Sequence, residues 1–314
     1  MTDLINKKIL VTSLENPDLD GVACSLAYAE FLNKKGKDAI AGIFGTPHRE
    51  AQFVLDKFKI NIDRLESLPR GYENIVLVDA SELLSLPKII KPKQVIEIID
   101  HRETNEKEKF INAKIQIEKV GACATLVAEK FRDNNLPISK EAALLLYPAV
   151  ASNTINFKSP LTTERDKNIG DWLKEQVEFP ENFIQEMFEA KSKINKPLKE
   201  VLIEDFKAFQ FKKKVGIAQL EIINTNKFIK DNLSEIVKIL SEIKEENSLD
   251  YIFLNGLDLE GAGNTFVAVS DEDIKMLESI LNIKFKNHLA VSDIPVMRKQ
   301  ISPMIQKYLE AGEK

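Results

Sequence analysis

The feature of this sequence that most constrains its fold is a series of short apolar runs, each of which ends in a carboxylate. Residues 75–78 are Ile-Val-Leu-Val and lead directly into Asp79. Residues 95–99 are also largely apolar and lead into Asp100 and His101. Continuous apolar runs of this length are typical of strands that are covered on both faces in a parallel sheet. Because helical patterns separate the runs, the sequence predicts an α/β fold.

An earlier apolar run, residues 8–13, leads through an acidic loop into a helical pattern. The loop carries Asp18 and Asp20, whose spacing allows both carboxylates to point at one hard cation. An equally simple interpretation is an Asp-rich turn that caps the helix. The carboxyl ends of parallel strands lie at one edge of a sheet, where α/β folds bind ligands. We therefore expect both aspartates at the same edge as Asp79 and His101, which favours a metal site.

The rest of the chain continues this alternation of strands and helices. Strands are expected at 38–44, 114–118, 205–209, 214–221, 251–254 and 265–269, and helices at 22–35, 49–58, 121–134, 139–152 and 227–245. The small residues 121–125 allow backbone amides to approach an anion at a helix N-terminus, although a packing surface of small residues explains them equally well. Thr162 is expected to cap the helix that follows it. A proline-flanked stretch at 192–197 is the expected domain boundary.

The composition excludes several classes of function. The 314 residues suffice for two domains, and the formal net charge of -5 provides no overall basic field for duplex nucleic acid. The cysteines, Cys24 and Cys123, form neither a metal-binding pattern nor a disulfide framework. No apolar run approaches membrane-spanning length, and the N-terminus lacks a signal-peptide core. We expect a cytoplasmic protein without a membrane or nucleic-acid partner.

The residues at these strand ends resemble the DHH phosphoesterase superfamily, in particular the manganese-dependent class II inorganic pyrophosphatases and the short-chain exopolyphosphatases. The blocks that carry the resemblance are residues 16–20, Asp79, the signature Asp100-His101-Arg102 and residues 153–160. Residues 205–209 and 298–303 are similar to basic motifs of the family's second domain. The Asp-His-Arg form of the signature resembles that of the eukaryotic Prune proteins, a polyphosphatase-like branch.

The resemblance implies a parallel-sheet DHH domain over residues 1–190, followed by a smaller mixed α/β domain, similar to DHHA2, over residues 196–314. It also implies a centre for one or two Mn²⁺ or Mg²⁺ ions, with the metal ligands Asp18, Asp20, Asp79, His101 and Asn153. The residues implied in binding substrate phosphate are Arg102, Lys207, Arg298 and Lys299, and those implied in catalysis are Asp79, Arg102 and Lys207. Because the resembling pyrophosphatases are dimers, a homodimer is also expected.

Three positions depart from the family pattern. Leu14 stands where a metal-binding His is expected, Asn153 where a metal-binding Asp is expected, and Arg102 in place of the second His of the signature. Loss of an imidazole and a carboxylate lowers the affinity for Mn²⁺ relative to Mg²⁺, which prefers oxygen ligands. His48, in a loop expected at the same sheet edge, could compensate, although a lone loop His is more often solvated.

The function predicted from these features is metal-dependent hydrolysis of a phosphoanhydride bond, in inorganic pyrophosphate or short polyphosphate, by a metal-activated water. Leu14 and Asn153 favour an alternative, a catalytically degenerate protein that binds a phosphate ligand or a partner. A second alternative is a phosphodiesterase acting on oligonucleotides or cyclic dinucleotides. Superfamily members with that role carry a Gly-Gly-Gly-His motif, which the nearest stretch, residues 256–263, lacks.

Overall fold

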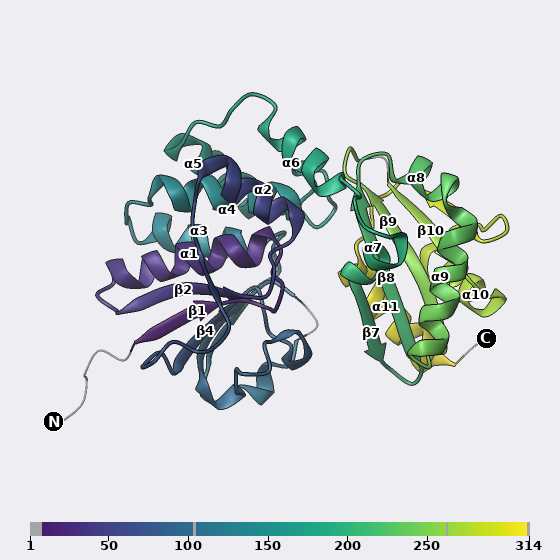
Figure 1. Cartoon of the computed structure of the whole chain (residues 1–314), viewed down its shortest axis with the longest axis horizontal. Helices are drawn as coiled ribbons and strands as arrows, with labels where there is room; N and C mark the ends of the chain where they lie inside the picture. The colour runs from purple at the N-terminus through teal and green to yellow at the C-terminus, as the bar shows by residue number, and fades with distance from the viewer. Residues whose placement is uncertain (1–7, 103–104, 262, 313–314) are drawn as a thin grey trace. The chain divides into compact units, whose positions relative to one another are not determined.

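The computed structural model describes residues 8–102, 105–261 and 263–312 of the chain (Figure 1). The chain divides into two compact units, Met1–Ala190 and Lys191–Lys314. Each unit contains a β-sheet and helices, so the predicted α/β fold with two sheets is confirmed. Among the described residues, no helix combines the length and the apolar character needed to cross a membrane.

The first unit is built on a six-stranded sheet in which every pair of neighbours is parallel. Its strands are β1 (Ile9–Thr12), β2 (Ala39–Phe44), β3 (Asp63–Leu65), β4 (Asn74–Val78), β5 (Val95–Asp100) and β6 (Lys114–Ile117). The spatial order β3-β2-β1-β4-β5-β6 reverses direction between β1 and β4. A reversal of this kind opens a crevice at the carboxyl ends of the two strands.

The helices of the first unit gather on one face of this sheet (Figure 1). They are α1 (Leu19–Lys34), α2 (Arg49–Phe58), α3 (Cys123–Asp133), α4 (Lys140–Asn153), α5 (Glu164–Gln176) and α6 (Phe183–Ser192). Helix α1 packs on β1, β2 and β4, and α3 packs on β5. Helix α4 packs on α1 and α3, and α5 packs on α3 and α4. The other face is covered by the segments that follow β4 and β5, where Leu86, Ile90 and Phe110 are buried against Leu77 and Ile98.

The second unit contains a mixed five-stranded sheet in the order β11-β10-β9-β8-β7. Its strands are β7 (Phe206–Gln210), β8 (Lys214–Ile222), β9 (Tyr251–Asp258), β10 (Asn264–Ala268) and β11 (Leu289–Ser292). Strands β8 and β9 are parallel and the other neighbours are antiparallel. Residues of α7 (Leu198–Glu204), α8 (Thr225–Asp231) and α9 (Leu233–Glu246) form one core cluster with the sheet. Residues of α10 (Asp271–Leu281) and α11 (Arg298–Ala311) form the other.

Two local predictions were wrong. The single helix expected over 227–245 is divided into α8 and α9 at Asn232, whose side-chain amide donates to the carbonyl of Phe228. The cap of α5 is Thr163 rather than Thr162, because the Thr163 hydroxyl accepts from the backbone N–H of Asp166. Strands β3 and β11 and helix α7 were not predicted, since seven residues or fewer carry little periodicity.

Candidate metal centre

Three buried side chains converge at the carboxyl ends of β1, β4 and β5. Asp20 lies in the first turn of α1, directly after the loop that leaves β1, while Asp79 and His101 each follow the last residue of a strand. One ligand atom from each of the three residues lies within 4.8 Å of the others. The sequence-predicted residues Asp20, Asp79 and His101 are therefore brought together at the point where the strand order reverses.

The His101 ring presents a nitrogen lone pair to the two carboxylates. Its Nδ1 lies 3.1 Å from the carbonyl oxygen of Val120, which can only accept, so Nδ1 is the donor. In the neutral ring Nε2 then carries the lone pair, and it lies 3.4 Å from Asp79 Oδ1 and 3.9 Å from Asp20 Oδ2. A lone pair facing two carboxylate oxygens is repulsive unless a proton or a metal ion lies between them, and a metal ion fits this arrangement.

Asp79 occupies an unusual backbone position for this role. Its φ of 52° is left-handed, a conformation that non-glycine residues seldom adopt, and its N–H donates to the carbonyl of Ile99 at 2.8 Å. The side chain is fully buried, and its Oδ1 accepts no hydrogen bond from any residue that the structure describes. A buried carboxylate oxygen without a donor is costly. This orphaned oxygen is a second feature that fits a bound cation.

Asp20 is held by the N-terminus of α3. Its Oδ2 accepts from the backbone N–H of Cys123 at 2.8 Å and its Oδ1 from that of Ala124 at 2.7 Å. The small residues at the start of this helix therefore receive an anion, and the anion is the carboxylate of Asp20 itself. Burial raises the pKa of Asp20 well above its usual range, the charges of Asp79 and Asp18 raise it further, and the two amides lower it.

Asp18 and Asn153 lie beside this group, and both are engaged in hydrogen bonds. Asp18 is the N-cap of α1, and its Oδ1 accepts from the N–H of Gly21 at 3.0 Å. Burial raises the pKa of Asp18, as does the charge of Asp79. Asn153, the last residue of α4, donates from Nδ2 to Asp20 Oδ2 at 2.6 Å. Its amide therefore meets the group as a donor in this structure.

The structure also places Leu14, which stands where a metal-binding His is expected, and His48, which could compensate for it. Leu14 is partly buried and packs against the core cluster that includes Leu77 and Ile98. His48 is the N-cap residue of α2, and its backbone N–H donates to the carbonyl of Pro17 at 2.9 Å. The charge of His48 lowers the pKa of Asp18, so the ring lies within electrostatic reach of that carboxylate.

Arg102 is turned back onto the acidic residues. Its Nη2 donates to Asp79 Oδ2 at 3.0 Å, and its Nη1 donates to Asp100 Oδ1 at 3.1 Å and to the backbone carbonyl of Asp79. Burial disfavours the charged guanidinium, but Asp79, Asp100 and Asp18 outweigh this effect and raise the pKa of Arg102. No role was predicted for Asp100 from the sequence. The structure shows that it is fully buried and orients Arg102, while Ser81 and the N–H of His101 donate to it.

The other three cations predicted to bind phosphate, Lys207, Arg298 and Lys299, lie in the second unit. Arg298 begins α11, and its guanidinium pairs with Asp205 while its backbone N–H donates to Gln219 Oε1 at 2.9 Å. Lys207 lies on β7 and Lys299 is the second residue of α11. In the same unit, His288 has its Nδ1 2.9 Å from the carbonyl of Ala268.

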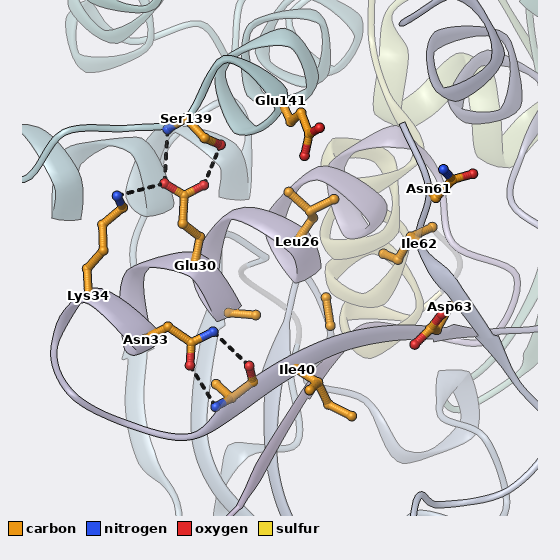
Figure 2. Close-up of a pocket in the computed structure, with 13 residues that line it drawn as sticks. Leu26, Glu30, Asn33, Lys34, Ile40, Asn61, Ile62, Asp63, Ser139 and Glu141 are labelled. Carbon is orange, nitrogen blue, oxygen red and sulfur yellow. Dashed lines mark hydrogen bonds and ion pairs between the residues drawn. The ribbon is translucent and has the colours of Figure 1, made fainter. Parts of the chain in front are cut away.

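A separate cavity of about 800 Å³ lies at the amino ends of β2 and β3, away from the carboxyl ends where the acidic group lies. Figure 2 shows Lys34 and Ser139 directed at the Glu30 carboxylate, which accepts from the Ser139 N–H at 2.9 Å. Asn33 in turn exchanges two hydrogen bonds with the backbone of Ala39. These polar groups hold α1 against its neighbours, and the cavity shows no cluster suited to chemistry.

The sequence matches two family models in succession. Residues 8–150 match the DHH family, N-terminal domain, and residues 185–308 match the DHHA2 domain. The chain is 28% identical over 306 residues to a "probable manganese-dependent inorganic pyrophosphatase" of Clostridium acetobutylicum, covering 96% of this chain and 98% of the relative. A protein with the same description from Bacillus cereus is 29% identical over 310 residues, covering 97% of this chain and all of the relative.

A solved structure shows the same likeness in three dimensions. The crystal structure described as a "putative family II inorganic pyrophosphatase" of Methanococcus jannaschii superposes with a TM-score of 0.79 at 29% sequence identity. The superposition covers 96% of this chain and 98% of that protein. The succession of two domains given by the family models agrees with a likeness that extends over nearly the whole chain. The chain therefore contains a DHH family N-terminal domain, followed by a DHHA2 domain.

Proposed function

We propose that this chain is a metal-dependent phosphohydrolase that cleaves the phosphoanhydride bond of inorganic pyrophosphate or of short polyphosphate. The observation that supports it is the buried group Asp20, Asp79 and His101, whose ligand atoms lie within 4.8 Å of one another. Its relatives that are named manganese-dependent inorganic pyrophosphatases align with nearly the whole chain. The proposed place of action is the cytoplasm, and the proposed assembly is a homodimer.

The proposed metal ligands are Asp20, Asp79 and His101, with Asp18 and Asn153 beside them. Carboxylate and imidazole ligands suit Mn²⁺, and the predominance of oxygen also suits Mg²⁺. A divalent ion held there supplies a Lewis acid for the phosphoryl group and lowers the pKa of a water molecule. The orphaned Asp79 Oδ1 and the lone pair of His101 Nε2 are the atoms that such an ion would satisfy.

The remaining proposed roles belong to cations of the chain. Arg102 is a guanidinium that stays protonated at neutral pH, so it orients Asp79 and offers charge to a phosphate rather than donating a proton. Lys207, Arg298 and Lys299 of the DHHA2 domain are the proposed phosphate-binding residues. Their charge would stabilise the negative charge that develops on the leaving phosphate.

A second candidate is a phosphate-binding protein that no longer catalyses. Leu14 is packed in a hydrophobic core cluster, and Asn153 donates to Asp20 instead of presenting an oxygen. Both observations reduce the number of ligands at the centre. This candidate shares the metal group with the first, so the two differ in turnover and not in ligand binding.

The test measures phosphate release with Mg²⁺, Mn²⁺ and Co²⁺ from pyrophosphate, a short polyphosphate and a dinucleotide. We expect release from the first two substrates, reduced about 10²-fold or more in Asp79→Ala, because loss of a metal ligand removes several kcal/mol of transition-state stabilisation. The matched control is Asp63→Ala, which changes an exposed aspartate of β3. Binding of pyrophosphate and metal without release would support the second candidate, and release from the dinucleotide alone would contradict both.

A further inference from the structure

The two oxygens of Asp79 face two different environments. Oδ1 lies 3.4 Å from His101 Nε2 and accepts no hydrogen bond among the described residues. Oδ2 accepts from Arg102 Nη2 at 3.0 Å. A carboxylate that joins two cations commonly uses one oxygen for each of them. In this chain one oxygen is open toward the Asp20 and His101 side, and the other is already occupied by a cationic side chain.

The guanidinium of Arg102 is held in this position from several directions. Besides Asp79 Oδ2, it donates to the carbonyl of Asp79 and to Asp100 Oδ1, the latter at 3.1 Å. Asp18 is the third carboxylate that acts on its charge. The side chain is 20% exposed, whereas both of its paired carboxylates are fully buried. A buried carboxylate needs a compensating cation, and here the chain supplies one of its own.

We infer that the centre of this chain binds one divalent cation, between Asp20, Asp79 Oδ1 and His101, and that the Arg102 guanidinium occupies the place of a second cation on Asp79 Oδ2. The inference deepens the proposed function and rests on the metal site that it names. A guanidinium carries a single positive charge and cannot activate water as a metal ion does. It neutralises and orients Asp79, so Arg102 is a positioning residue for the single ion.

On the Oδ1 side of Asp79, the chain offers enough ligands to bind one ion. Asp20 is fixed there by two backbone amides of α3, and His101 is fixed by the Val120 carbonyl. Two carboxylates and one neutral imidazole match the charge of a divalent ion. On the Oδ2 side, Asp79 is already paired with the Arg102 guanidinium.

The test counts Mn²⁺ per chain in the full-length protein by equilibrium dialysis with elemental analysis, and records the electron paramagnetic resonance spectrum at saturation. We expect one ion per chain and the spectrum of an isolated Mn²⁺ centre. In Arg102→Gln, which removes the charge at similar size, the count should rise toward two and the spectrum should show spin coupling between neighbouring ions. Arg102→Lys keeps the charge and should stay at one ion.

The matched control is Arg165→Gln, because Arg165 also pairs with two carboxylates, Glu118 and Glu129, but outside the centre. It should leave the count at one. Two ions in the wild-type chain would overturn the inference without any variant, and a folded Arg102→Gln chain that stays at one ion would overturn the role of Arg102. A count of zero would contradict the proposed function as well. One bound ion without phosphate release would contradict the proposed hydrolysis alone.

Discussion

At the scale of single residues, the hydrogen-bond partners of the carboxylate oxygens determine the geometry of the centre. Asp20 accepts from two backbone amides and from Asn153, and Asp79 carries one paired and one orphaned oxygen. The charge of Asp79 raises the pKa of Asp20, and a bound cation would offset this cost of ionising Asp20. Two predictions at this scale follow from the Asn153 hydrogen bond and from the pKa of Asp20.

Asn153→Asp should lower the stability of the metal-free chain and increase the stabilisation by Mn²⁺. The change removes the donor that lies 2.6 Å from Asp20 Oδ2 and places a carboxylate there. We expect a loss of about 1–3 kcal/mol in chelator, because Asp20 Oδ2 loses one of its two donors and gains a carboxylate neighbour. Added Mn²⁺ should raise the melting temperature more than in wild type, since a ligand that binds only the folded state stabilises it.

Thermal melting with chelator and with Mn²⁺ measures both effects. The matched control is Asn226→Asp, which changes an amide that donates to Thr265 in the second unit. If Asn153→Asp melts like wild type under both conditions, Asn153 does not contact the ion.

The pH dependence of metal stabilisation should follow the raised pKa of Asp20. Burial, with the charges of Asp79 and Asp18, makes the folded chain hold this proton more tightly than the unfolded chain. The protonated group therefore stabilises the metal-free fold below the ordinary pKa of Asp, and this contribution is lost as the pH rises through the raised value. An ion must displace the proton, so its effect should increase with pH.

The measurement compares the Mn²⁺-induced rise in melting temperature at about pH 5 and about pH 7.5, on either side of the range in which carboxylates and His titrate. The groups that face Asp20 include Asp18, Asp79 and His101, and they act in the same direction because each binds metal in its deprotonated form. An equal rise at both pH values would exclude proton competition at the centre.

At the scale of elements, the start of α3 positions the centre, and α5 positions the start of α3. The Asp166 carboxylate, fully buried in the first turn of α5, accepts from the N–H of Gly121 at 2.9 Å and from the Thr125 hydroxyl at 2.6 Å. A Cβ on Gly121 would lie 2.5 Å from a methyl group of Thr154, so the backbone approaches closely here. The amides that hold Asp20 therefore depend on a contact between two helices.

Asp166→Asn should destabilise the fold by about 1–3 kcal/mol, since several donors lose a charged acceptor. It should also weaken Mn²⁺ binding, because the amides of Cys123 and Ala124 would shift relative to Asp20. Asp273 of the second unit is the matched control, since it is equally buried and forms the same type of capping box with Ser270. Calorimetry should show weaker Mn²⁺ binding in Asp166→Asn and unchanged binding in Asp273→Asn. Equal affinities in the two variants would refute this coupling.

At the scale of the whole molecule, the two units have separate hydrophobic cores. The first contains the cluster around Leu77 and Ile98, and the second contains one cluster on each face of its own sheet. All of the proposed metal ligands lie in the first unit, between Asp18 and Asn153. A metal ion should therefore stabilise one unit directly.

Scanning calorimetry of the full chain should resolve two transitions, and Mn²⁺ should raise the temperature of one of them. The reason is that a ligand shifts the unfolding only of the cooperative unit that binds it. Asp79→Ala should abolish the shift and leave the other transition in place. A single transition that moves as a whole with Mn²⁺ would show that the two units unfold together.

The sequence alone determined the α/β class, most strands of the first sheet and the residues that lie at its carboxyl edge. This was possible because apolar runs, helical periodicity and strand-end carboxylates are local properties of the chain. Asp20, Asp79 and His101 follow from the rule that parallel strands end at one edge. Very short elements such as β3 were missed, since three residues carry almost no pattern.

Only the tertiary structure decided which hydrogen-bond partner each polar atom of the centre has. It placed the Asp20 carboxylate on the N-terminus of α3, about one hundred residues away along the chain, and made Asn153 a donor to Asp20. It also placed the Arg102 guanidinium on Asp79 and packed the partly buried Leu14 against a core cluster. These outcomes depend on which distant segments meet in space and on which donors lie close to each oxygen. The sequence around a residue does not contain this information.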